Sequence, residues 1–118
     1  MAKVLISPGK YVQGAGEMKK LGEYAQNYGK KALILISKGG YKRIGAMVEK
    51  SFEGKECGYV FDYFNGECSK KEIKRLGEIV KEEACDVVIG IGGGKIFDTA
   101  KAVAYYEKTP VLICPTIA

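Results

Sequence analysis

Four apolar runs alternate with amphipathic segments along most of the chain, and this alternation limits the possible folds more than any other feature. The runs are ALILIS (residues 32–37), GYVFDYF (58–64), DVVIGI (86–91) and PVLICP (110–115). Strands that are covered on both faces of a parallel sheet read as nearly continuous apolar runs, and parallel strands need crossover connections. The sequence therefore predicts an α/β domain with a mainly parallel sheet flanked by helices.

Helical spacing of apolar residues fills the segments between these runs. Residues 17–28 and 41–52 are expected to be helices, and a further helix should follow Ser69, because Glu72 three places later completes a capping-box pattern. A short strand is expected at Lys3–Ile6. The expected buried faces are Met18, Leu21, Ala25 and Tyr28; Ile44, Met47, Val48 and Phe52; and Ile73, Leu76, Val80 and Ala84.

Length and composition favour one cytoplasmic domain spanning residues 1–118. At 118 residues there is little chain left for a second core, and no apolar run approaches the ~18 residues that cross a bilayer. The opening MAKVLISPGKY is too short in its apolar part for a signal peptide, so no membrane association is expected. The 4 cysteines form no C-x-x-C pair and are interpreted as reduced thiols.

The chain contains no histidine, which restricts its chemistry. Ser/His and Cys/His nucleophile pairs and histidine-ligated metal sites are excluded for these residues. We therefore predict neither a catalytic residue nor a metal ligand within the chain.

Positive charge is concentrated in the first half. Residues 1–50 carry a net charge of +7, and residues 51–118 carry −2, for +5 overall. This distribution suits a phosphorylated ligand, although solvated surface lysines would give the same count. Nucleic acid is not expected as a partner, because only Arg43 and Arg75 are arginines and no nucleic-acid-binding motif is present.

The stretch VVIGIGGGKIFDTAKA (87–102) predicts a strand over 87–91, a turn at Gly92, Gly93 and Gly94, and a helix from Lys95. Glycines allow a close backbone approach, and N–H groups at a helix start attract anions, so the loop suits a pyrophosphate. It matches neither G-x-G-x-x-G nor the Walker A pattern. The alternative is that the glycines only ease the packing of strand against helix.

Two further polar residues are candidates for the same site. Asp98 is placed in the first turn of the helix, where it could cap exposed N–H groups or contact a ligand. Thr116 follows Pro115 at the end of the last strand and could reach a ligand across the strand ends, or could simply form a turn. The sequence leaves both pairs of alternatives open.

The combination of GIGGGKIFDTAKAVA with PVLICPTIA resembles the iron- or zinc-dependent polyol dehydrogenases, the group III alcohol dehydrogenases, and among them most closely the glycerol dehydrogenases. ISPGKYVQGAGEMKKLGEY and FNGECSKKEIKRL resemble the same family, so the likeness covers essentially the whole chain. It implies a Rossmann-like dinucleotide-binding domain. The pyrophosphate would lie at Gly92, Gly93, Gly94 and Lys95, with Asp98 nearby and Thr116 close to the adenine.

The resemblance also implies a reaction, the reversible oxidation of a secondary alcohol such as glycerol to dihydroxyacetone by NAD or NADP. In the family, zinc or iron is held by an aspartate and two histidines of a following helical domain, and this chain contains neither those histidines nor that domain. The sequence thus resembles one half of an enzyme that ends early at its C-terminus and is not expected to turn over alone. A small polyol is a partner only if a second domain is supplied.

Cofactor choice depends on the end of the second strand, where NAD-using relatives carry an aspartate. Here the stretch is ISKGG. Ser37 can donate to a ribose hydroxyl or to a 2′-phosphate, and Lys38 could neutralise that phosphate or be simply solvated, so NAD and NADP both remain open.

Two alternatives complete the expectations. The chain could be a non-enzymatic nucleotide-binding module, or a subunit completed by a separate metal-domain chain. An exposed domain face would leave apolar surface uncovered, so either association through that face, for example as an oligomer, or marginal stability in solution is expected.

Overall fold

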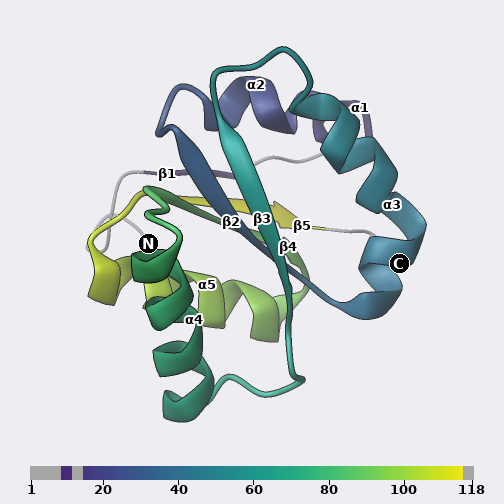
Figure 1. Cartoon of the computed structure of the whole chain (residues 1–118). Helices are drawn as coiled ribbons and strands as arrows, with labels where there is room; N and C mark the ends of the chain where they lie inside the picture. The colour runs from purple at the N-terminus through teal and green to yellow at the C-terminus, as the bar shows by residue number, and fades with distance from the viewer. Residues whose placement is uncertain (1–8, 12–14, 116–118) are drawn as a thin grey trace.

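Five parallel strands form a single sheet in the computed structural model, which describes residues 9–11 and 15–115, with side chains from residue 17 onward. The order across the sheet is β1-β5-β4-β2-β3, and every pairing is parallel, as predicted (Figure 1). The strands are β1 (Gly9–Tyr11), β2 (Lys31–Ile36), β3 (Gly58–Tyr63), β4 (Val87–Gly92) and β5 (Val111–Pro115).

Helices cover both faces of the sheet, which gives three layers (Figure 1). One face is covered by α1, α2 and α3, and the other by α4 and α5. Within the described residues, no helix has both the length and the apolar character that crossing a membrane requires. The helices are α1 (Ala15–Met18), α2 (Leu21–Ala25), α3 (Lys38–Ser51), α4 (Lys70–Glu82) and α5 (Gly94–Glu107).

Strand β2 shows why the apolar runs are continuous. Ile34 and Ile36 pack in the cluster beneath α1–α3, whereas Leu33 and Leu35 pack in the cluster beneath α4 and α5. All four side chains are at most 1% exposed, because successive side chains point to opposite faces and both faces are covered. The two apolar clusters together form the core.

The helix predicted over residues 17–28 is wrong as a single element, because the structure contains two short helices there. The backbone N–H of Gly22 donates to the Ser51 hydroxyl at 3.0 Å, so α3 supplies an acceptor that a continuous helix would have supplied from Met18. A tertiary hydrogen bond therefore replaces one rung of the helical ladder. The expected inward face is retained, since Met18, Leu21 and Ala25 are all buried.

Two residues assigned to buried helix faces are instead exposed. Met47 on α3 is 37% exposed. Ala84 is exposed because α4 ends at Glu82 and Ala84 adopts a left-handed backbone conformation with φ 56°. The next residue, Cys85, donates its N–H back to the Val80 carbonyl at 2.9 Å, a common way for a helix to end.

The start of α4 follows the sequence prediction. Ser69 is the N-cap, and its hydroxyl accepts from the Glu72 N–H at 3.1 Å. The strand expected at Lys3–Ile6 lies outside the described residues. Strand β1 at Gly9–Tyr11 was not predicted, because its sequence GKY carries no apolar run.

Candidate functional site

The residues predicted to bind a ligand lie at the ends of two neighbouring strands. Ser37 and Lys38 follow β2, and the glycine turn follows β4; these strands pair directly, with Ile36 opposite Ile91. Helix α3 leaves β2 toward one face of the sheet and α5 leaves β4 toward the other (Figure 1). Divergent helices at the carboxyl ends of adjacent parallel strands form a topological switch point, where α/β sheets bind their ligands.

The three glycines of the turn have different structural roles. Gly92 ends β4 with φ +147°, a backbone conformation that other residues rarely adopt, and a Cβ there would lie 2.7 Å from the terminal Cδ1 of Ile96, which would have to shift. Gly93 is the N-cap of α5 and Gly94 its first residue, and a Cβ on either would meet no atom within 4 Å. Open space above backbone N–H groups at a helix start is what a phosphate needs.

The boundaries of this turn correct two expectations. Strand β4 continues through Gly92, and α5 begins at Gly94 instead of Lys95. Asp98 is therefore the fifth helical residue, and the first turn contains no acidic residue. Because uncapped N–H groups lie in the first turn, the proposed capping role of Asp98 is wrong. Its side chain is exposed on α5, one turn from the glycines.

Lys95 lies in the first turn of α5 with its side chain 66% exposed. Its ammonium Nζ lies 3.4 Å from Oε2 of Glu67, in the loop between β3 and α4. The lysine is thus held at the carboxyl edge of the sheet by a solvent-exposed ion pair. Such pairs are weak, so an anionic ligand can replace the carboxylate.

Ser37 and Lys38 begin α3. The Ser37 hydroxyl oxygen caps the helix by accepting from the Gly40 N–H at 3.0 Å, which leaves its hydrogen available for donation to a ligand. Lys38 is exposed, and its Nζ lies 6.0 Å from the centroid of the Tyr63 ring. A Cβ on Gly39 would meet no atom within 4 Å, whereas one on Gly40 would lie 3.0 Å from Ile36.

Thr116, the remaining predicted site residue, lies outside the described residues. Strand β5 pairs with β4, with Gly92 opposite Pro115. The residue immediately before Thr116 is therefore level with the glycine turn.

Sequence reasoning missed two residues that lie at this edge of the sheet. Glu67 contacts Lys95, and Tyr63, at the end of β3, has a side chain 41% exposed beside Lys38. The signal was available in principle, because loops that follow neighbouring parallel strands meet at the same edge. Tyr63 ends β3 and Glu67 lies in the loop that follows it, and the sequence does not specify that β3 is an edge strand beside β2.

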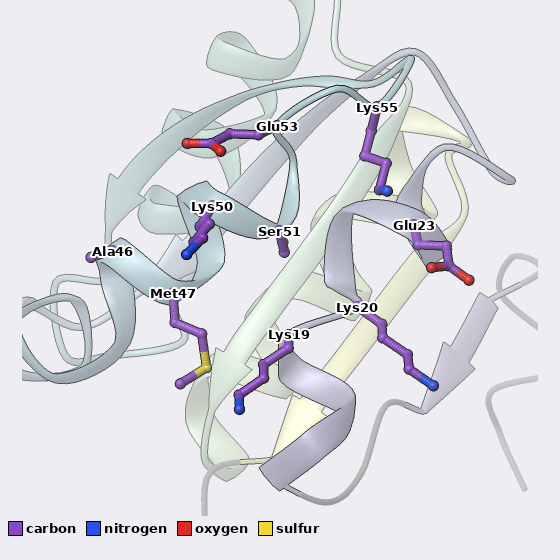
Figure 2. Close-up of a pocket in the computed structure, with 9 residues that line it drawn as sticks. All are labelled: Lys19, Lys20, Glu23, Ala46, Met47, Lys50, Ser51, Glu53 and Lys55. Atoms are coloured by element: carbon purple, nitrogen blue, oxygen red, sulfur yellow. The ribbon is translucent and has the colours of Figure 1, made fainter.

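A separate cavity of about 550 Å³ lies between the α1–α2 region and α3 (Figure 2). Four lysines and two glutamates contribute to its lining, as do Met47 and Ser51. None of the predicted site residues lines it, and Lys55, one of its lysines, precedes β3 and so lies toward the opposite edge of the sheet. The lining residues are Lys19, Lys20, Glu23, Ala46, Met47, Lys50, Ser51, Glu53 and Lys55.

The switch-point residues have the features that a dinucleotide needs. Two helix starts, open space at Gly93 and Gly94, and two exposed lysines suit a diphosphate with a ribose alongside. Within the part of the chain that the structure describes, no group of three or more Cys, Asp or Glu side chains is arranged to hold a metal ion.

The sheet order, the three layers and the switch point define a Rossmann-like α/β domain. The family model for iron-containing alcohol dehydrogenases matches residues 8–118, and the chain belongs to that family.

Relatives and solved structures agree with this assignment. The glycerol dehydrogenase of Thermotoga maritima is 47% identical over 125 aligned residues that include the whole of this chain. A probable glycerol dehydrogenase from Sinorhizobium meliloti is 39% identical with a TM-score of 0.77, over 93% of this chain and 29% of that one. The NADH-dependent butanol dehydrogenase A of Thermotoga maritima is 31% identical with a TM-score of 0.68, over 83% and 26% respectively.

The matched relatives are much longer than this chain. It spans 32% of the length of the curated glycerol dehydrogenases that it matches. What those proteins do as whole enzymes therefore depends in large part on sequence that this chain does not share.

Proposed function

We propose that this chain is the dinucleotide-binding part of a glycerol-dehydrogenase-like oxidoreductase, and that it binds NAD or NADP at the switch point, at the carboxyl ends of β2 and β4. One observation carries the proposal: the two residue groups selected from sequence, 54 to 58 positions apart at Ser37–Lys38 and Gly92–Lys95, lie at the ends of strands that pair directly. The resemblance to enzymes that include an NADH-dependent member supports the choice of ligand.

Each residue has a proposed task at its own atoms. The N–H groups at the start of α5 and the Lys95 ammonium bind the diphosphate. The Ser37 hydroxyl donates to the adenosine ribose or its 2′-phosphate, and Lys38 offsets the charge of that phosphate. Asp98 and Thr116 remain candidates for ligand contact on the basis of the family resemblance. The bound nicotinamide would supply hydride acceptance, while this chain holds it in place.

Turnover is proposed to need residues outside this chain. With no histidine, the chain cannot supply the family's metal ligands, so a zinc or iron ion and the polyol would be held by another domain or another subunit. Oxidation of a polyol such as glycerol to dihydroxyacetone belongs to that complete assembly. A cytoplasmic setting is part of the same proposal.

The edge of the sheet beside the switch point also offers a surface for association. Tyr63, which is 41% exposed, ends the edge strand β3 and lies beside Lys38. We propose that this edge contacts a second domain or another copy of the chain.

Titration of the 118-residue chain with NADH and with NADPH tests the binding proposal. Ligand binding to the folded state stabilises it by RT ln(1 + [L]/Kd), about 2.7 kcal/mol at a hundredfold excess of ligand over Kd, so the melting temperature should rise. Lys95→Ala should weaken binding about tenfold, as expected for loss of one charge-assisted contact of about 1.4 kcal/mol.

Lys55→Ala is the matched control, because it removes the same charge from the cavity of Figure 2, toward the other edge of the sheet. We expect it to bind as the wild type does. If Lys55→Ala loses binding and Lys95→Ala keeps it, the ligand occupies that cavity and the proposed site is wrong. No heat and no melting shift with either cofactor would overturn the proposed function itself.

A further inference from the structure

The loop between β3 and α4 brings a carboxylate to the glycine turn. Oε2 of Glu67 lies 3.4 Å from Nζ of Lys95, across 28 positions in sequence. The two side chains are 74% and 66% exposed, so water and ligands reach both. This contact joins two loops that follow different strands at the same edge of the sheet.

A hydrogen-bond network with one buried member, Glu72, fixes the position of that loop. Glu72, in the first turn of α4, is 1% exposed, and its Oε2 accepts from the Asn65 N–H at 3.2 Å. The Asn65 side chain in turn accepts from the Glu67 N–H at 3.1 Å. The backbone of Glu67 is thus connected through one residue to a carboxylate anchored in the core.

Arg75 holds Glu72 in this role. Its guanidinium donates to both Glu72 carboxylate oxygens at 2.8 Å and to Asp62 at 2.9 Å. It also donates to the Tyr63 carbonyl at 3.2 Å, which ties the network to the end of β3. The guanidinium thus donates to Glu72, Asp62 and Tyr63, and the cation that Glu67 contacts is Lys95.

We propose that Glu67 is a further affinity-determining residue of the switch-point site: its carboxylate pairs with the Lys95 ammonium in the free protein and must be displaced by the ligand diphosphate. The inference rests on the proposed function, since it concerns the same site. An anion approaching Lys95 has to displace Glu67 and then remain near its negative charge. Glu67 therefore lowers the affinity for the ligand, and it lowers the affinity more for ligands of greater negative charge.

The sign of this effect separates it from a supporting role. If the residue only shaped the loop, its substitution would lower the affinity of the protein for the ligand. Removal of a competing carboxylate raises that affinity. Glu67→Gln keeps the size of the side chain and its backbone bond to Asn65. We expect Glu67→Gln to bind NADH about two- to fivefold more tightly, the range for release of an exposed ion pair.

The dependence of ligand affinity on salt concentration is a second readout, which a purely structural role of Glu67 would not change. The advantage of Glu67→Gln should be largest at low ionic strength and should vanish near 1 M salt, where the screening length falls to about 3 Å. Glu67→Asp, which keeps the charge, should stay close to the wild type. Glu53→Gln is the matched control, because it makes the same change of charge on an exposed residue between α3 and β3.

The experiment titrates the 118-residue chain and these variants with NADH, and in parallel with inorganic pyrophosphate. Tighter binding of both probes by Glu67→Gln alone supports the inference. If wild type binds NADH and Glu67→Gln matches Glu53→Gln, the inference is overturned and the proposed function stands. If NADH never binds but pyrophosphate binds more tightly to Glu67→Gln, the proposed function fails and the role of Glu67 holds. If neither probe binds any variant, both fail.

Discussion

The backbone N–H of Gly22 donates to the side-chain hydroxyl of Ser51 at 3.0 Å, and this bond joins α2 to the end of α3. Ser51 is 6% exposed, and its hydroxyl donates to the Val48 carbonyl at 2.6 Å. The two helices approach so closely that a Cβ on Gly22 would overlap the carbonyl oxygen of Ser51. This contact both divides the first helical segment and fixes it against α3.

Gly22→Ala is therefore expected to destabilise the domain by about 1–3 kcal/mol, because backbone must move to admit the methyl group. Urea unfolding monitored by circular dichroism measures the change. Gly39→Ala serves as the comparison, since a Cβ there meets no atom within 4 Å and alanine favours helix. Equal stability of the two variants would show that α2 and α3 are farther apart than described.

Stability should depend on acid through Glu72. Hydrogen bonds from Arg75 lower the pKa of Glu72 below its ordinary value of 4.5, although burial alone would raise it. A carboxylate with a depressed pKa stabilises the folded state above the unfolded pKa, and this contribution is lost as pH falls through the folded pKa.

Glu72→Gln should accordingly lower the free energy of unfolding by about 1–2 kcal/mol near neutral pH, a figure reduced because Arg75 is partly exposed. The difference from wild type should shrink as pH falls through the folded pKa of Glu72, because the wild-type carboxyl then also becomes protonated. Unfolding in urea at several pH values measures it. A difference that stays constant with pH would contradict the ionic origin.

Cofactor choice should respond to Ser37. Ser37→Asp retains an N-cap for α3 while placing a carboxylate where a 2′-phosphate would lie. We expect NADPH affinity to fall about tenfold, with NADH affinity unchanged or improved. Fluorescence titration with both cofactors measures the ratio, and neutral Ser37→Asn separates charge from size. A parallel loss of both cofactors would indicate that Ser37 does not face the ribose.

The cysteines should react at very different rates. Burial raises the pKa of Cys57 and Cys85 to about 11 and that of Cys114 to about 12, and all three are buried. Cys68 is exposed in the loop before α4. A thiol reagent near pH 8 should therefore label one thiol rapidly and the other three only on unfolding. Cys68→Ser should remove the rapid phase, and more than one rapid thiol in wild type would contradict the packing.

The sequence predicted the layers of this fold better than its details. Continuous apolar runs such as residues 32–37 identify strands covered on both faces, and this pattern does not depend on which helices cover them. The split of residues 17–28 and the exposure of Ala84 were not predictable in the same way. The first depends on a hydroxyl 29 positions away, and the second on where α4 ends.

The candidate site was predictable where its chemistry is local. The composition of the glycine turn with Lys95 predicts a candidate anion site. Ser37 was selected because it follows a strand. Glu67 was missed because only the sheet order brings the loop after β3 to the loop after β4. Asp98 was misplaced because the helix begins one residue earlier than expected, and one residue decides which turn a side chain occupies.

The pairing of β2 with β4, and therefore the switch point, depends on contacts between residues far apart in the sequence. Asp86 accepts from the Lys30 N–H at 2.8 Å across 56 positions, so the contact encloses the whole of α3, β3 and α4. Closing a loop of that length carries an entropic cost that neighbouring helical turns do not, and chains of high contact order fold slowly. The glycine turn excised as a peptide would lack its partner strand. The proposed binding surface therefore forms only with the complete chain topology.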